Sequence, residues 1–313
     1  MTQCRPIRLD AAALSGYARL FADCYPRSAK FTPQYLRWLY CQNPEGPAIG
    51  FDAWDGDRLA GHYVGVPARV RVQGRELRAL LSLNTATHPD YRGQGLFIRL
   101  AQMGYEAAAA SGFEAVFGVA NANSTHGFVR KLGFQLVQPL QASVGIGGLA
   151  VDWDLALRKA QFVRAWSAQS LAWRCANPAN PVFMRRRGHS WQCHAAAQGL
   201  WLPAYGELPL TAPHEGADAP SGALSPLRLF IGLLPQGATR LRRYAPIPHS
   251  LRPSPLNFIW RPLSQQVGAL ESGSVNFSFL DFDAYWSSCC EAGRTVPVCA
   301  SGRRVRRLSE DAR

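Results

Sequence analysis

Residues 87–97 read THPDYRGQGLF, and they place two glycines and an arginine where an alternating apolar segment gives way to a helical one. Gly93 and Gly95 allow the backbone to take a positive φ and a ligand to approach the main chain closely. The helix that follows begins with unpaired N–H groups and with the positive end of its dipole. The stretch therefore predicts a strand, a loop that binds an anion such as a pyrophosphate, and a helix.

The segment before this loop predicts three antiparallel strands. Residues 49–89 are rich in alternating and β-branched positions, and the turns fall at Asp55-Gly56 and Gln73-Gly74. Two helices precede the strands, one capped by Asp10 and one capped by Thr32 with Pro33 in its first turn. A dinucleotide-binding fold is disfavoured, because the full G-x-G-x-x-G pattern is missing and the strands before the loop form a meander.

The remaining elements complete an α/β pattern. We expect a helix over residues 95–112, a buried strand over 113–120, a short helix over 123–133 and a closing pair of strands over 134–147. Residues 151–175 predict one long helix. The order favours an α/β (α+β) fold in which helices cover both faces of a mixed sheet.

A short repeat suggests that the chain contains two related halves. YLRWLYCQNPEGP, residues 35–47, recurs with one gap as SLAWRCANPANP, residues 170–181. Both copies close a predicted helix and precede an apolar segment, which favours an internal duplication. We therefore predict a domain over residues 1–150, a degenerate copy over 151–300 and a flexible basic tail over 301–313. A Pro- and Gly-rich loop is expected at residues 208–226.

Composition favours some classes of partner and disfavours others. The chain of 313 residues has a formal charge of +13, and its only lysines are Lys30, Lys131 and Lys159. This charge favours anionic partners, but no nucleic-acid recognition motif accompanies it, so nucleic-acid binding is disfavoured. The eight cysteines lack metal-ligand spacing, and no metal is expected. No export signal or membrane span is evident, so we expect reduced thiols and a cytoplasmic protein.

Two signatures in order resemble the GNAT superfamily of acyl-CoA-dependent N-acyltransferases. The phosphate loop of that family reads Q/R-x-x-G-x-G/A, and residues 90–95, DYRGQG, occupy it with Asp90 in place of the usual first residue. The second signature, an Asn-containing turn and a helix ending in K-L-G-F, is matched by NANSTHGFVRKLGF, residues 121–134. The resemblance covers roughly residues 4–147 and implies a GNAT-like domain followed by a degenerate GNAT-like one.

The resemblance also implies a donor site for acetyl-CoA. The loop and first turn that would hold the pyrophosphate comprise Arg92, Gly93, Gln94, Gly95, Leu96 and Phe97. Leu83 and Thr85 would pair with the pantetheine arm in a gap of the sheet. Asn123 of the second signature would contact the cofactor, although a helix N-cap is an equally simple role for it.

The catalytic groups are less clear from the sequence. Many relatives use a tyrosine as the acid for the leaving thiolate, but Val129 occupies the aligned position. His88 is a candidate base near neutral pH, or simply a turn residue. Asn84, which orients but cannot deprotonate, and Glu45 are further candidates. We interpret Asp281 and Asp283, which alternate on one predicted strand, as surface or interdomain residues.

The predicted activity is transfer of an acetyl or other acyl group from acetyl-CoA to the amine of a small molecule, by direct attack on the thioester. Amino sugars and sugar nucleotides are one class of acceptor. The second half would form part of the acceptor cleft. Two alternatives remain open: a non-catalytic CoA-binding or scaffold module, and an aminoacyl transferase like the FemAB proteins. The sequence leaves the oligomeric state undetermined.

Overall fold

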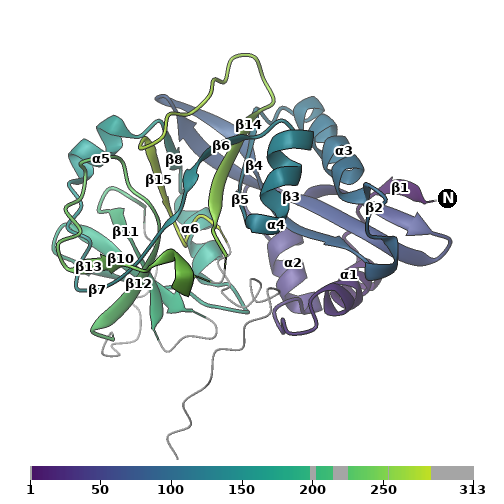
Figure 1. The fold of residues 1–313 in the computed structure, drawn as a ribbon, viewed down its shortest axis with the longest axis horizontal. Helices are drawn as coiled ribbons and strands as arrows, with labels where there is room; N and C mark the ends of the chain where they lie inside the picture. Colours follow the sequence, from purple (N-terminus) through teal and green to yellow (C-terminus); the bar gives the residue numbers. More distant parts are fainter. Residues whose placement is uncertain (1, 198–201, 214–224, 253, 283–313) are drawn as a thin grey trace, which may run out of the picture.

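The computed structural model describes residues 2–197, 202–213, 225–252 and 254–282. Their strands join into one mixed sheet of 15 strands. Figure 1 shows that this sheet is folded into two lobes that lie side by side. The predicted α/β class with a mixed sheet is confirmed. The predicted tail at residues 301–313 and most of the predicted loop at 208–226 lie outside the described residues.

The first helices begin where their caps predict. The elements are β1 (Gln3–Pro6), α1 (Ala11–Cys24) and α2 (Pro33–Cys41). The side chains of Asp10 and Thr32 accept hydrogen bonds from the backbone N–H groups of Ala13 and Tyr35, so each satisfies one of the unpaired donors of a first helical turn. Pro33 opens α2, where its missing N–H costs nothing.

The predicted meander is confirmed. Its strands are β2 (Ile49–Asp55), β3 (Arg58–Val72) and β4 (Arg75–Thr87). They pair antiparallel in the order of the chain. Gly56 and Gly74 take φ values of 57° and 85° in the two turns, a conformation that glycine adopts without strain.

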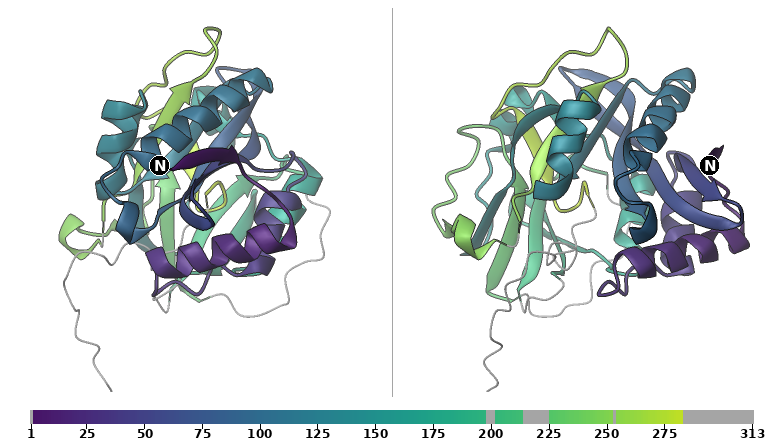
Figure 2. Two further views of the ribbon diagram at one scale, coloured as in Figure 1. Left: turned by 90° about the vertical axis from the view of Figure 1, so that its right-hand side faces the viewer. Right: turned by 45° about the vertical axis from the view of Figure 1, so that its right-hand side comes forward.

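Helices cover both faces of this meander. The next elements are α3 (Leu96–Ala110), β5 (Ala115–Ala120), α4 (Ala122–His126), a π-helical turn (Gly127–Lys131) and β6 (Gln135–Pro139). Buried side chains of α1 and α2 share a core with Val64 and Val66 of β3, whereas those of α3 pack on Tyr63 and Leu80. Figure 2 shows α1 and α3 on opposite sides of the strands. The sheet therefore separates two apolar cores.

The single helix predicted over residues 151–175 is wrong. The segment contains α5 (Trp153–Lys159), β8 (Phe162–Arg164) and α6 (Ala168–Cys175). β8 pairs with β3, and Ser167 caps α6 in a reciprocal hydrogen-bonded box with Ser170. Sheet pairing and a new N-cap thus interrupt a stretch whose composition alone suits a helix.

The second half repeats the strand order of the first. Its strands are β9 (Phe183–Arg187), β10 (Ser190–Ala196), β11 (Pro203–Pro209), β12 (Leu227–Leu233), β13 (Tyr244–Pro246), β14 (Asn257–Pro262) and β15 (Val275–Ser278). β9, β10 and β11 form an antiparallel meander, and β12 runs parallel to β11. β5 runs parallel to β4 in the same way.

The halves exchange one strand each. The prediction that residues 134–147 form a closing pair is wrong, because β7 (Gln141–Ile146) leaves β6 and pairs with β12 and β13. In return β14 enters between β5 and β6. We call the part of the sheet around β1–β6 and β14 the first lobe, and the part around β7 and β9–β13 the second lobe. Both lobes thus contain strands from both halves of the sequence.

Candidate functional site

The loop before α3 has the geometry that its glycines predict. Gly93 and Gly95 take φ values of 78° and 73°, and a side chain at either position would meet no atom within 4 Å. The backbone conformation, and not crowding, therefore favours glycine here. Among the described residues, the first backbone N–H of this helix with a carbonyl acceptor is that of Arg99, which donates to Gly95. The preceding N–H groups and the helix dipole form an anion-binding end.

The sheet opens beside this loop. β4 and β5 pair from Ala79 and Ala115 as far as Ser82 and Gly118, and no pairing continues beyond. One extra residue in β4 forms a bulge against β3 at this point, and Asn84 within it takes a φ of 52°. The strands diverge here and leave backbone groups that an extended ligand can pair with.

A cavity of about 600 Å³ occupies this divergence. Of the predicted donor residues, Thr85, Arg92, Phe97 and Asn123 line it, as does Asn84. Gly93, Gln94 and Gly95 lie exposed on the loop beside it, and Leu96 is buried in the core under α3. Leu83 points to the other face of β4. The structure thus gathers the loop, the sheet opening and the second signature around one cavity.

The second signature contributes one wall. Asn121, and not Asn123, is the N-cap of α4: its side chain accepts from the N–H of Ser124, and the hydroxyl of Ser124 accepts from the N–H of Asn121. Asn123 therefore remains in the wall without a capping role. Phe97 packs edge-on against Phe128 of the π-helical turn, with ring centroids 5.1 Å apart. This aromatic contact joins the start of α3 to the second signature.

Two of the predicted catalytic residues lie away from the cavity lining. His88 contacts Arg58, with 3.1 Å from Nη2 to Nε2, and accepts from the backbone N–H of Asp90 through Nδ1. Glu45 forms an ion pair with Arg69, with 2.9 Å between Oε2 and Nε. The cavity lining holds no carboxylate and no imidazole among the described residues.

Tyr25 is a phenol of the cavity lining that the sequence analysis overlooked. Its hydroxyl donates to the carbonyl of Thr85 across 2.7 Å. Tyr25 follows the last residue of α1, and only the packing of α1 on β4 brings it to this wall.

Asn84 is connected to a buried chain of hydrogen bonds that the sequence analysis also missed. Its Nδ2 donates to the hydroxyl of Tyr40 (3.2 Å), which donates to Nε2 of His62 (3.0 Å). Nδ1 of His62 donates to Asp52 (2.6 Å), which also accepts from Tyr17 (2.7 Å). Because an ionised carboxylate only accepts, Nδ1 of His62 carries a proton, and in a neutral imidazole Nε2 then accepts from Tyr40. The carbonyl oxygen of Asn84 is left for the cavity.

This chain is fully enclosed. His62 and Tyr40 have no exposed surface, and 1% of Asp52 is exposed. Burial raises the pKa of Tyr17 and of Tyr40 well above the ordinary value, so both phenols stay protonated. Asp52 and His62 are opposite each other on β2 and β3. A bulge at Ala53 and Trp54 shifts the register of this hairpin. The pairing of Asp52 with His62 therefore cannot be predicted by counting residues from the turn.

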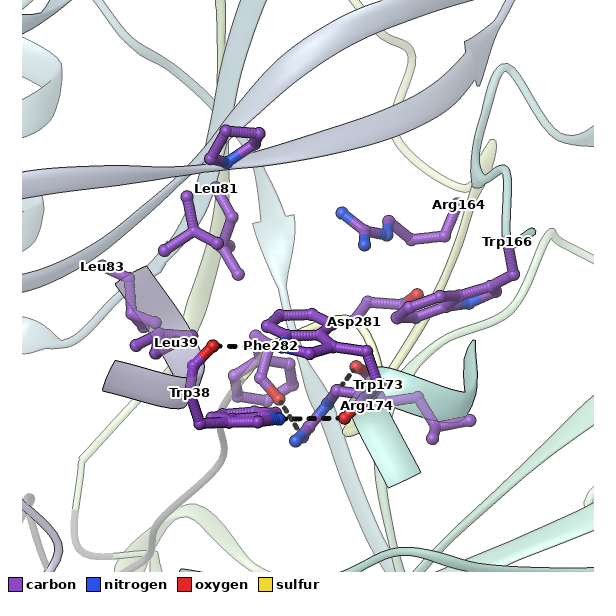
Figure 3. Close-up of a pocket in the computed structure, with 13 residues that line it drawn as sticks. Trp38, Leu39, Leu81, Leu83, Arg164, Trp166, Trp173, Arg174, Asp281 and Phe282 are labelled. Atoms are coloured by element: carbon purple, nitrogen blue, oxygen red, sulfur yellow. Dashed lines mark hydrogen bonds between the residues drawn. The ribbon is translucent and has the colours of Figure 1, made fainter. Parts of the chain in front are cut away.

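A second, smaller pocket of about 20 Å³ lies on the other face of β4, between the lobes. Leu81 and Leu83 line it, whereas Ser82 and Asn84 face the larger cavity. Figure 3 shows the aromatic and charged side chains that converge here from both lobes. Asp281 is one of them and is 6% exposed, so it is an interdomain residue and not a surface one. Asp283 lies outside the described residues.

Within the described residues, no three or more His, Cys, Asp or Glu side chains are grouped to hold a metal ion. None of the described helices combines the length and the apolar character that crossing a membrane requires.

A comparison with known protein families gives a match for the first part of the chain. Residues 5–137 match the family model described as an acetyltransferase (GNAT) domain. No curated protein sequence gives a significant match.

Solved structures resemble the chain across both lobes. A probable N-acyltransferase of unknown function from Enterococcus faecalis has a TM-score of 0.55 at 11% identity, over 84% of this chain and 73% of that one. A GCN5-related N-acetyltransferase from Anabaena variabilis has a TM-score of 0.52 at 11% identity, over 84% and 73%. Eis1 from Mycobacterium abscessus has a TM-score of 0.52 at 10% identity, over 84% and 74%. At these identities the likeness shows the fold, and the family model matches residues 5–137, fewer than half of the residues of the chain.

Proposed function

We propose that residues 1–150 transfer an acetyl or other acyl group from acetyl-CoA to the amine of a small molecule, and that residues 151–300 help to form the acceptor cleft. One observation carries the proposal: the anion-binding start of α3 opens onto the same cavity as the gap between β4 and β5. A pyrophosphate at the loop would place an extended pantetheine arm along the unpaired edge of β4.

The residues around the cavity have distinct roles in this proposal. The N–H groups from Gly93 to Phe97 bind the pyrophosphate. Asn123 contacts the cofactor from α4, and Leu83 and Thr85 offer backbone groups to the pantetheine. The hydroxyl of Tyr25 already engages the carbonyl of Thr85. An amide of pantetheine would therefore pair with Leu83 or displace Tyr25.

The reaction consumes only acyl-CoA and the amine. The neutral nitrogen attacks the thioester carbonyl carbon, the C–S bond breaks, and the CoA thiolate takes up a proton while the new amide nitrogen loses one. The carbonyl oxygen of Asn84 is placed to accept from an amine N–H, which orients the nitrogen but does not deprotonate it. His88 and Glu45 remain candidate bases. Acetyl-CoA as donor and the cytoplasm as location stay predictions.

A screen for thiol release tests the proposal. The full chain is incubated with acetyl-CoA and with amino sugars, polyamines, aminoglycosides and amine-bearing acids. Release of CoA thiol that depends on an amine, with a matching acetylated product by mass spectrometry, is the expected result. Acetyl-CoA binding without any amine-dependent release would contradict it.

That last outcome identifies the second candidate, a CoA-binding module without catalysis. It is favoured by Val129 at the position of the usual acid and by a cavity lining without a carboxylate or an imidazole among the described residues. Absence of acetyl-CoA binding would contradict both candidates. Transfer from aminoacyl-tRNA in place of acetyl-CoA would indicate the aminoacyl transferase alternative.

A further inference from the structure

A third cavity, of about 200 Å³, lies between the lobes and apart from the proposed donor cavity. Arg164, Trp166 and Asp281 line both this cavity and the small pocket around Trp38 and Trp173, so the two spaces adjoin. The walls come from β3 and β4 of the first lobe and from β11 and β15 on the other side. The cavity is therefore built by the junction of the two halves.

Arg164 enters this space without a polar partner. Among the described residues it makes no ion pair and no hydrogen bond, and its Nε is buried and unsatisfied. Its guanidinium stacks over the indole of Trp166, 4.4 Å from the ring centroid. Burial lowers the pKa of Arg164 to about 10. A stacked guanidinium keeps its edge donors available, and those donors match the oxygens of a carboxylate or phosphate.

Figure 3 shows the Arg164 guanidinium directed into the small pocket that adjoins this cavity, toward the side of Leu81. The indole N–H of Trp166 is likewise buried without an acceptor among the described residues. Two adjacent donors thus lack the hydrogen bonds that buried polar groups ordinarily make. A ligand that accepts hydrogen bonds would satisfy both.

Asp281 supplies the opposite charge. Its Oδ2 accepts from the backbone N–H of Ser278 across 2.6 Å, while its other oxygen accepts no hydrogen bond from a described residue. Asp281 and Arg164 line the same cavity but form no ion pair with each other. Arg164 is half-buried and Asp281 is buried, and opposite charges that have lost water without forming a pair with each other are costly.

The other charged groups of the cavity are engaged or peripheral. Glu76 forms an ion pair with Arg69, and the Glu207 carboxylate accepts hydrogen bonds from the backbone of Leu149, from Ser190 and from Tyr205. The side chain of Arg71 is exposed at the rim. The unmatched charges inside are therefore one cation and one anion.

We propose that this interlobe cavity binds a small amine-bearing acid. The carboxylate or phosphate of the ligand pairs with the guanidinium of Arg164, and its ammonium pairs with the carboxylate of Asp281. A ligand with both charges satisfies both groups at once, whereas a simple acid or a simple amine leaves one of them unpaired. Asp281 lies on the side of β4 opposite Asn84, so this binding site goes beyond the proposed function, in which Asn84 orients the amine in the donor cavity. The small pocket adjoining the cavity reaches the face of β4 opposite the donor cavity, at Leu81 and Leu83.

Calorimetric titration of the full chain, without CoA, tests the proposal. The probes are γ-aminobutyrate, which pairs an amine with a carboxylate, and O-phosphoethanolamine, which pairs it with a phosphate. Butyrate and ethanolamine are the singly charged controls. We expect at least one probe to bind more than about tenfold more tightly than either control, since each charge pair in a desolvated site contributes at least about a factor of ten. The probe that binds identifies the anion.

Arg164→Gln should weaken binding of that probe by about tenfold or more while leaving the affinity for acetyl-CoA unchanged. Arg78→Gln is the matched control, because Arg78 stacks on Phe113 at 4.1 Å outside the cavity. If Arg164→Gln does not fold, as judged by thermal unfolding, Asp281→Asn tests the other charge in the same titration. Equal binding of probes and controls, or full affinity in the folded variant, would overturn the proposal.

The result separates this proposal from the proposed function. Acetyl-CoA binding and thiol release with a simple amine, together with no binding of either probe, would leave the transferase in place and remove the interlobe site. Binding of a probe through Arg164 by a chain that does not bind acetyl-CoA would do the reverse.

Discussion

Trp38 and Trp173 stack across the boundary between the lobes, with ring centroids 4.6 Å apart and planes inclined by 16°. Each indole N–H donates to the backbone carbonyl of the other residue, across 3.0 and 3.1 Å. The two tryptophans are the equivalent positions of the sequence repeat, so the repeat meets itself at a local twofold axis. The Asn-Pro turns match too: Asn43 and Asn177 each accept from the N–H two residues on.

This pair should hold the lobes together. Replacing either Trp38 or Trp173 with Ala should lower the free energy of unfolding by about 3 kcal/mol or more, because a large stacked ring is lost from a packed boundary. The double variant should lose about 1 kcal/mol less than the sum, since the second change removes a contact already broken. Urea denaturation measures this. Trp38→Ala combined with Trp191→Ala, a pair that is not stacked, should be additive.

Replacing a glycine of the loop before α3 should weaken ligand binding, whereas replacing a turn glycine elsewhere should not. Gly95→Val should weaken acetyl-CoA binding by more than about tenfold, because a β-branched residue resists positive φ and the loop rearranges at the anion site. Gly56→Val is the matched control: its φ of 57° is also positive, and its side chain would also meet nothing within 4 Å. Both variants should lose similar stability, while calorimetry should find reduced affinity only in Gly95→Val. Unchanged affinity there would contradict the pyrophosphate assignment.

His88 can be tested as a base. A catalytic base would make His88→Ala lose more turnover at acidic than at alkaline pH, because the residual uncatalysed route needs an amine that is already neutral. The contacts of His88 with Arg58 and Asp90 lead us to expect a different result. Turnover should fall by less than about tenfold at every pH, through loosening of the loop. A pH–rate profile distinguishes the two outcomes.

The buried chain behind Asn84 should set the orientation of its amide. Tyr40→Phe removes the hydroxyl that accepts from Asn84 and should lower kcat by about tenfold with little change in acetyl-CoA affinity, because Asn84 can then turn its N–H groups to the cavity. Tyr105→Phe, which removes another buried hydroxyl, one that accepts a hydrogen bond from Tyr63, is the control and should retain kcat. Equal kcat in Tyr40→Phe and wild type would show that the chain serves stability alone.

Asp281 predicts a pH-dependent stability. Burial raises the pKa of this carboxyl from 3.8 to about 6, against the opposing charges of Arg164 and Arg174 and the hydrogen bond from Ser278. The folded state therefore binds the proton more tightly than the unfolded state. The stabilisation is full below pH 3.8 and is lost as the pH rises through 6, and the ionised group then costs up to about 3 kcal/mol.

Asp281→Asn removes this titration. Relative to wild type, the variant should gain most stability above pH 6, and its advantage should shrink between pH 6 and pH 4. Chemical denaturation at a series of pH values measures the difference. A constant difference across that range would mean that Asp281 does not titrate with a raised pKa.

Local chemistry was sufficient to predict the first two helices, the meander and the glycine loop of the first lobe. The caps Asp10 and Thr32 and the turns at Gly56 and Gly74 each act within a few residues, so the sequence shows them directly. The loop at Gly93 and Gly95 was predictable for the same reason. Pairings between distant segments could not be predicted. β8 pairs with β3 and β15, and no local pattern within residues 160–166 indicates those partners.

The candidate site likewise contains residues that local sequence patterns indicate and residues that only tertiary packing brings together. Thr85, Arg92, Phe97 and Asn123 line one cavity, and they lie within or close to two short signatures of the sequence. Tyr25, Tyr40 and His62 reach the site only through tertiary packing, and a bulge hides the pairing of His62 with Asp52. Arg164 was indistinguishable by sequence from the other arginines of a basic chain. Its significance comes from the polar contacts that it lacks.

The exchange of β7 and β14 sets the order in which this protein can be completed during synthesis. Ala120 of β5 pairs with Asn257 of β14. The ribosome must therefore synthesise most of the chain before the sheet of the first lobe can be completed. Until then β5 and β6 present open edges to any other strand. Ser254, just before β14, also lines the donor cavity and accepts from the N–H of Ala122. A fragment cut after the GNAT signatures would carry every glycine of the loop and still lack a finished donor site.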